Sequence, residues 1–132
     1  MRILVDTNIF IALKDSKDPI HKKALLVKNK IPKKASIVVT SQIISETITI
    51  LAKKLGKKLA IDFANDLKEF EIIYITEDVV YKALKLFYRI KSKNASFADC
   101  TSIVIAKDKK YKIGATFTFD KHFKQQKVKL LS

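Results

Sequence analysis

Four of the 13 acidic residues, Asp6, Glu46, Asp99 and Asp120, have apolar or small neighbours, whereas the other acids lie among lysines. If these four carboxylates meet in the folded chain, they repel one another. Two carboxylates ~5 Å apart at an effective dielectric of about 20 are destabilised by ~3 kcal/mol. Such a cluster must take up protons, separate or bind a hard divalent cation through oxygen. Because no His or Cys cluster accompanies them, this donor set favours Mg²⁺ or Mn²⁺ over zinc.

The elements that would position these acids are short strands that alternate with helices. Apolar and β-branched runs predict strands at 2–5, 36–40, 72–75 and 115–119, and a short fifth strand at 128–131. Apolar residues at helical spacing predict helices over 7–14, 20–30, 41–54 and 59–70, after Thr76, and from Ser96 towards Gly114, with a polar break at 91–95. We expect one domain, 1–132, of the α/β class, with three α/β/α layers and a central parallel sheet of four to five short strands flanked by helices.

This fold would gather the four acids at one edge of the sheet. Asp6 follows the first strand and Asp120 follows the fourth, while Glu46 and Asp99 lie in the first turns of helices that leave the same edge. Ligand sites of open parallel sheets form there. Each acid also has a structural interpretation: Asp6 and Asp120 as helix N-caps, Asp99 as half of a capping box with Ser96, and Glu46 as an exposed helix residue.

The charge balance indicates a polyanionic partner. The 132 residues include 27 Lys+Arg against 13 Asp+Glu, a formal net charge of +14 and a pI near 9.9. Nucleic acid is the first candidate for such a surface. Two glycines are too few for a phosphate-binding glycine-rich loop. One cysteine fits a reducing cytoplasm, and the longest uncharged stretch is too short to span a membrane.

The basic and aromatic residues suggest how nucleic acid would be held. Lysine outnumbers arginine 25 to two, which favours contacts with phosphates over reading of bases. The clusters are Lys53–Lys54, Lys57–Lys58 and Lys107–Lys112. Tyr74, Tyr81, Tyr88 and Tyr111 could stack bases, but the first three fall in apolar patterns that predict core positions. For His122 we expect a packing or surface role, with proton donation as the minor alternative.

Four fragments, in this order, resemble the motifs of the PIN-domain nucleases and, among them, the VapC-like toxins of toxin–antitoxin pairs. They are Val5-Asp6-Thr7-Asn8, Ser45-Glu46, Phe97-Ala98-Asp99 and Thr118-Phe119-Asp120-Lys121-His122-Phe123. The resemblance implies an endoribonuclease that uses Mg²⁺ or Mn²⁺ and metal-activated water to hydrolyse RNA. It implies that Asp6, Glu46 and Asp99 are metal ligands, that Asp120 contributes directly or indirectly, and that Thr7, Asn8 and Thr118 support them.

The resemblance also implies partners: RNA, a small antitoxin protein and a second copy in a homodimer. Three alternatives stay open. The chain could be an RNA-processing PIN nuclease outside toxin–antitoxin systems, or a non-catalytic nucleic-acid-binding module. It could also be a phosphotransfer domain with Asp6 as nucleophile, although Asn8 stands where the dehalogenase pattern has a second Asp.

Overall fold

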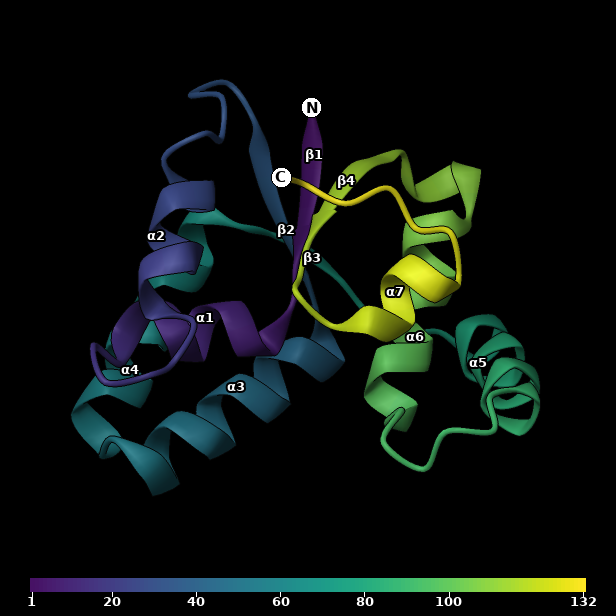
Figure 1. The fold of residues 1–132 in the computed structure, drawn as a ribbon, viewed down its shortest axis with the longest axis horizontal. Helices are drawn as coiled ribbons and strands as arrows, with labels where there is room; N and C mark the ends of the chain where they lie inside the picture. Colours follow the sequence, from purple (N-terminus) through teal and green to yellow (C-terminus); the bar gives the residue numbers. More distant parts are fainter.

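A four-stranded parallel sheet forms the centre of the molecule in a computed structural model that describes all 132 residues (Figure 1). Its strands are β1 (Arg2–Val5), β2 (Ser36–Thr40), β3 (Glu71–Ile73) and β4 (Ile113–Phe117), in the spatial order β3-β2-β1-β4. Every neighbouring pair is parallel, with Ile3 opposite Ile37 on one side and Ala115 on the other. The expected α/β fold with a central parallel sheet is confirmed.

Seven α-helices flank this sheet. They are α1 (Thr7–Lys14), α2 (His21–Lys28), α3 (Ser41–Lys54), α4 (Lys57–Asp66), α5 (Glu77–Arg89), α6 (Phe97–Lys107) and α7 (Lys121–Gln125), with 3₁₀ turns η1 (Leu67–Glu69) and η2 (Lys109–Tyr111). The chain runs from β1 to β3 in one direction and returns past β1 to β4. Because parallel crossovers are right-handed, this reversal puts α5 and α6 on the opposite face from α1, α2 and α4 (Figure 1). No helix combines the length and the apolarity needed to cross a membrane.

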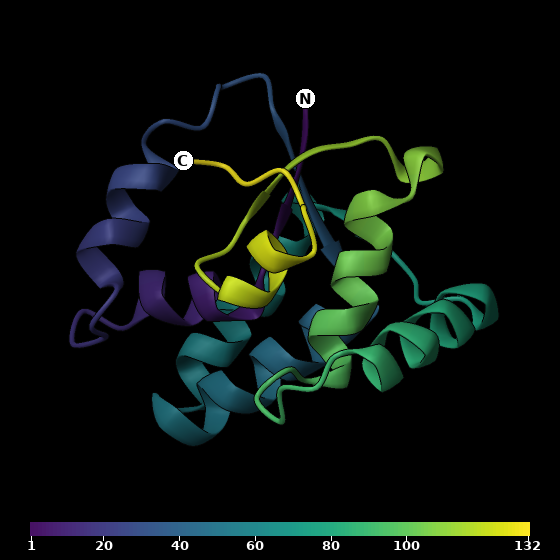
Figure 2. The same cartoon turned by 45° about the vertical axis from the view of Figure 1, so that its right-hand side comes forward.

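Two groups of buried side chains hold the helices to the sheet. The larger contains 19 residues and centres on β1, β2, α1 and α4, where Phe10 meets the fully buried Phe63 edge-on at 4.9 Å between ring centroids. The smaller joins α5, α6 and α7 through Leu86, Ile103 and Phe123. Figure 2 shows α7 in front of the sheet and beside α6. Phe123 therefore anchors the short α7 and fixes the loop that connects it to β4.

The last strand begins two residues earlier than its sequence predicts. Gly114 was expected to end the preceding helix, but it lies inside β4, and α6 ends at Lys107. A Cβ atom at position 114 would come within 2.8 Å of the Cγ atom of Met1, so a larger residue there would require the exposed Met1 side chain to move. The turn before β4 is completed by Lys112, whose φ of 53° is left-handed.

The predicted fifth strand is reduced to one bridge between Thr116 and Leu130. The backbone N–H of Thr116 donates to Lys129 and its carbonyl accepts from Leu131, both at 2.9 Å. This segment covers the outer edge of β4 without extending the sheet.

The prediction that three tyrosines lie in the core is wrong. Tyr74, Tyr81 and Tyr88 are 69%, 60% and 79% exposed. Tyr74 lies in the loop after β3, whereas Tyr81 and Tyr88 lie on α5, which packs chiefly against α6 and so buries only the stripe that contains Val79 and Leu86. The apolar positions in the α5 sequence therefore span a wider face of the helix than the face that α6 covers.

Candidate metal centre

Asp6 is fixed between the ends of β1 and the neighbouring β4. It follows β1, is 5% exposed, and donates its backbone N–H to the carbonyl of Phe117 in β4 at 3.0 Å. Oδ1 accepts the N–H of Thr7 at 2.8 Å, which caps α1, and Oδ2 accepts the hydroxyl of Thr118 at 2.8 Å. This carboxylate is therefore buried at the carboxyl edge of the sheet, where the strand order reverses.

Asp99 forms the capping box expected from the sequence. Its Oδ2 accepts the backbone N–H of Ser96 at 3.1 Å, and its own N–H donates to the Ser96 hydroxyl at 3.0 Å. The cap holds the half-buried carboxylate in the first turn of α6 and leaves Oδ1 without a hydrogen-bond donor from the backbone. The structural and the functional interpretations of Asp99 are thus compatible.

Asp120 is held by Thr118 and His122. Its backbone N–H donates to the Thr118 hydroxyl at 3.1 Å, and its Oδ1 accepts the backbone N–H of His122 at 2.8 Å, which caps α7. The ring Nδ1 of His122 lies 2.8 Å from the same oxygen, a distance at which an Nδ1–H donates. The ring is 3% exposed and its Nε2 has no partner. His122 therefore packs inside and orients Asp120, which excludes the surface role.

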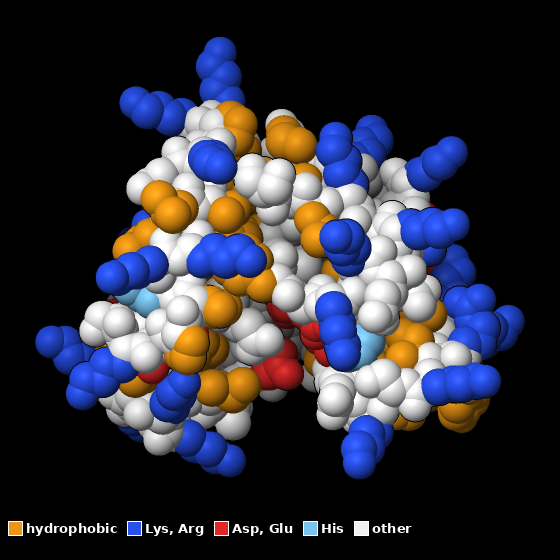
Figure 3. Space-filling view, in the orientation of Figure 1, with side chains coloured by type: hydrophobic (Ala, Val, Ile, Leu, Met, Phe, Trp, Pro, Cys, Tyr) orange, Lys and Arg blue, Asp and Glu red, His pale blue; other side chains and the backbone are white.

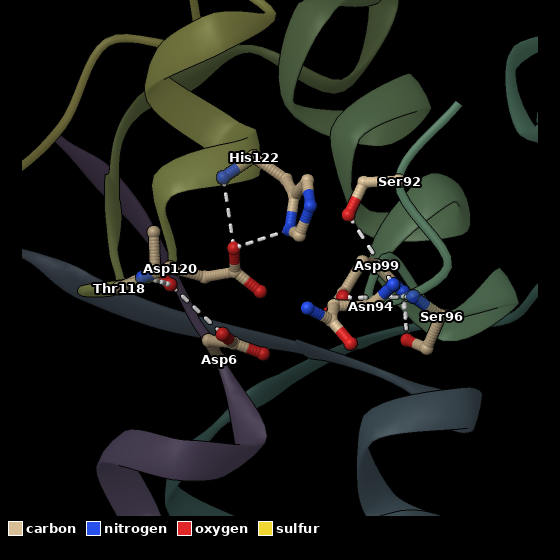
Figure 4. A network of polar contacts seen from close by, with 8 residues as sticks. All are labelled: Asp6, Ser92, Asn94, Ser96, Asp99, Thr118, Asp120 and His122. Atoms are coloured by element: carbon tan, nitrogen blue, oxygen red, sulfur yellow. Dashed lines mark hydrogen bonds and ion pairs between the residues drawn. The ribbon is translucent and has the colours of Figure 1, made fainter. Parts of the chain in front are cut away.

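The three aspartates converge although they come from distant parts of the chain. In Figure 4 the carboxylates of Asp6, Asp99 and Asp120 face one space between β1, α6 and the start of α7. Ligand atoms of Asp99, Asp120 and His122 lie within 4.8 Å of one another. Figure 3 shows acidic side chains gathered in a hollow at the centre of this face, with lysines around it. The centre is an anionic hollow in a cationic surface.

Burial and mutual repulsion make full ionisation of this group unfavourable. Burial raises the pKa of Asp6 to about 7, and the charges of Asp99 and Asp120 add to the shift, against the hydrogen bonds from Thr118 and Thr7. The pKa of Asp99 is also raised, by burial and by the nearby Asp120. A hard divalent cation would neutralise these charges through carboxylate oxygens, so the donor set fits Mg²⁺ or Mn²⁺.

The structure does not tie every candidate to this centre. Glu46 lies half-buried on α3 and makes no hydrogen bond or ion pair with the aspartates. Asn8 is exposed in the first turn of α1 and has no polar side-chain contact. The Thr7 hydroxyl is buried without a partner, so only the backbone N–H of Thr7 contacts Asp6.

Asn94 is a residue that sequence reasoning missed. Its side-chain amide points towards the space shared by Asp6 and Asp120 (Figure 4), and its backbone N–H donates to the Ser92 hydroxyl at 3.2 Å. Asn94 lies in the polar break between α5 and α6. This segment has no helical or strand periodicity from which the direction of the Asn94 side chain could be predicted. Its position depends on how the loop folds back over the start of α6.

Thr118 should be the main hydrogen-bonding support of the centre. We expect Thr118→Val to lower the free energy of unfolding at pH 8 by about 2 kcal/mol, because it removes the donor to Asp6 and the acceptor for Asp120. Thr116→Val is the matched control, since its equally buried hydroxyl has no partner, and it should be neutral or slightly stabilising. Urea denaturation measures both, and equal effects would contradict the assigned hydrogen bonds.

Known proteins share this fold. The PIN domain family matches residues 3–129, and no curated protein shows significant similarity to the chain. The structure of VapC20 from Mycobacterium tuberculosis, a sarcin–ricin-loop-cleaving toxin, gives a TM-score of 0.79 at 24% identity over 93% of both chains. FitAcB from Neisseria gonorrhoeae gives 0.68 at 17% identity, over 98% of this chain and 96% of that one.

VapBC2 from Rickettsia felis, solved bound to a DNA fragment from its promoter, gives a TM-score of 0.60 at 17% identity, over 100% of this chain and 98% of that one. At such identities the solved structures show a common fold, whereas the family match spans nearly every residue. The chain therefore has the fold of the VapC-like toxins and belongs to the PIN-domain family.

Proposed function

We propose that this protein is a metal-dependent endoribonuclease and the toxin of a toxin–antitoxin pair. The observation that carries the proposal is that Asp99 and Asp120 lie close together and that Asp6 faces the same hollow, in a protein with a net charge of +14. Membership of the PIN-domain family supports it. A cationic exterior attracts the RNA backbone, and an anionic hollow with raised carboxyl pKa values is suited to a cation that works on that backbone.

We assign the cation to the carboxylates of Asp6, Asp99 and Asp120, with Glu46 as a further oxygen donor from α3. When bound, Mg²⁺ or Mn²⁺ would polarise the phosphate and make water more acidic. Thr118 holds Asp6 by a hydrogen bond, and His122 holds Asp120. These contacts fix the directions of two carboxylates before any substrate arrives, so the geometry needs little reorganisation.

The resemblance to the PIN-domain nucleases gives the proposed reaction. Water forms the new bond to phosphorus and loses a proton, while the bond to the 3′ oxygen breaks and that oxygen takes up a proton from solvent, which leaves a 5′-phosphate and a 3′-hydroxyl. The oxygens of Asp99 and Asp120 that carry no backbone hydrogen bond are available to take the proton from water. The amide of Asn94 faces the same space and would donate to a phosphate oxygen.

Chelation should abolish cleavage. With EDTA in excess we expect no detectable cutting of labelled RNA, because the unneutralised carboxylates repel the phosphate backbone. Excess Mg²⁺ or Mn²⁺ should restore cleavage in the same sample, which controls for damage by the chelator. Equal cleavage rates with and without EDTA in folded protein would contradict the proposed mechanism.

The proposed protein partner is a small antitoxin. We also propose that the chain forms a homodimer and acts in the cytoplasm. The structures of VapBC2 and of VapBC-1 from nontypeable Haemophilus influenzae share this fold, and each is named as a VapBC pair, which supports an antitoxin partner. An RNA-processing nuclease would use the same hollow, so the neighbouring gene distinguishes the two. A short adjacent reading frame for a DNA-binding protein that inhibits cleavage is expected for a toxin. A lone gene whose product cleaves without arresting growth would favour RNA processing.

A further inference from the structure

We propose that a groove between α5 and α6 binds the backbone and bases of a single-stranded RNA segment that extends from the acidic centre. The inference rests on the proposed function and assigns it an additional substrate-binding region. The groove is a cavity of about 410 Å³. Four cationic side chains line it over an apolar floor that includes Leu86 and Val104; these are Lys82, Lys85, Arg89 and Lys107.

The positive charge of this groove is largely uncompensated. No carboxylate lines it. Lys82 forms ion pairs with Asp78 at 3.0 Å and Asp108 at 3.8 Å, but Lys85, Arg89 and Lys107 form none. Cations gathered around one cavity repel one another, and a chain of phosphates relieves that repulsion. Figure 3 shows Lys and Arg side chains on the α5 and α6 side of the molecule, as over the rest of this face, with apolar patches between them.

Two helices connect the groove with the acidic centre. Lys107 lies eight residues after Asp99 on α6, which places it about 12 Å further along the helix axis and roughly a quarter turn around it. Gln126, the C-cap of α7, borders the groove at the end of that helix opposite the N-cap Asp120. An RNA strand that leaves the hollow in this direction meets the groove within a few nucleotides.

Two exposed aromatic rings border the cationic side of α5. Tyr81, Lys85 and Tyr88 follow the i, i+4, i+7 spacing of one helix face, so Lys85 lies between the two rings. The rings are 60% and 79% exposed. Aromatic rings next to cations stack unpaired bases while the cations contact phosphates. Bases in a duplex are already stacked on each other, so this combination favours single-stranded RNA.

The first experiment removes the phosphate contacts. Binding of a fluorescent single-stranded RNA is measured by anisotropy in EDTA over a range of salt concentrations. In Lys85→Gln/Arg89→Gln/Lys107→Gln the slope of log affinity against log salt should become shallower by about 2, and affinity at 0.1 M salt should fall roughly 100-fold. The control Lys22→Gln/Lys30→Gln/Lys34→Gln loses the same charge from exposed, unpaired lysines on α2 and in the loop that follows it and should change both quantities little.

The second experiment removes the rings. Tyr81→Ala and Tyr88→Ala should each weaken single-stranded RNA binding about tenfold, without a change in the salt slope or in duplex binding. All substituted residues are exposed, and thermal unfolding should show that every variant folds as the original protein does.

The outcomes separate the groove from the function. If the unaltered protein neither binds nor cuts RNA, the proposed function fails. If it cuts RNA and the groove triple binds like its control, the groove proposal is overturned and the function stands. Polyglutamate serves as an acidic polypeptide probe. If the groove triple weakens binding of polyglutamate but not of RNA, the groove is a protein-binding site and the proposal is likewise overturned.

Discussion

Replacement of Asp99 by Asn should lower RNA cleavage at saturating Mg²⁺ by roughly 10²- to 10³-fold in kcat. The change removes one negative charge from the carboxylate group while its remaining oxygen can still accept the Ser96 N–H. The α6 cap therefore persists, and thermal unfolding should show an intact fold. Asp6→Asn should have an equal or larger effect, because Asp6 is the most buried of the three acids. Initial rates with a labelled RNA measure both variants.

Asp62→Asn is the matched control for these variants. Asp62 lies on α4, outside the hollow, and forms no ion pair, so the substitution makes the same chemical change without touching the centre. Its cleavage rate should stay within about twofold of the original, the range of a surface substitution. A similar rate in Asp99→Asn and Asp62→Asn would remove Asp99 from the proposed metal site.

Local sequence signals predict the elements well where one residue fixes a boundary. Thr76 and Ser96 were expected to cap helices, and their hydroxyls accept the N–H groups of Val79 at 3.3 Å and Asp99 at 3.0 Å. The pattern fails where tertiary contacts decide. Gly114 looks like a helix stop, but it lies inside β4 next to the side chain of Met1. The sequence around position 114 contains no information on a residue more than a hundred positions away.

The same distinction applies to the candidate centre. Strand ends and parallel order place Asp6 and Asp120 at one edge, and the structure has both there with Asp99. The contact of His122 with Asp120 and the direction of Asn94 depend on side-chain rotamers and loop conformation, which periodicity does not encode. Glu46 lies on α3, and its distance from the aspartates depends on the direction in which that helix leaves the sheet. The sequence does not encode this direction.

The stability of the metal-free protein should fall as pH rises from 4 to 8. Asp6 has its pKa raised from 3.8 to about 7 by burial, so the folded state holds the Asp6 proton more tightly than the unfolded chain does. Well below pH 4 Asp6 is protonated in both states. As pH rises towards 7, the unfolded state gains from ionising and the folded state does not, which costs up to about 4 kcal/mol of unfolding free energy. The raised pKa of Asp99 acts in the same direction.

Two comparisons by urea denaturation in EDTA test this expectation. Asp6→Asn cannot ionise, so its unfolding free energy should vary less with pH, and at pH 8 this variant should be more stable than the metal-free original although it does not cut RNA. Mg²⁺ or Mn²⁺ should restore the stability of the original at pH 8 and leave Asp6→Asn nearly unchanged, because a ligand stabilises only the state that binds it. A metal-free protein as stable at pH 8 as at pH 5 would show that Asp6 ionises without cost. Charge repulsion in the hollow would then be too weak to favour binding of a cation.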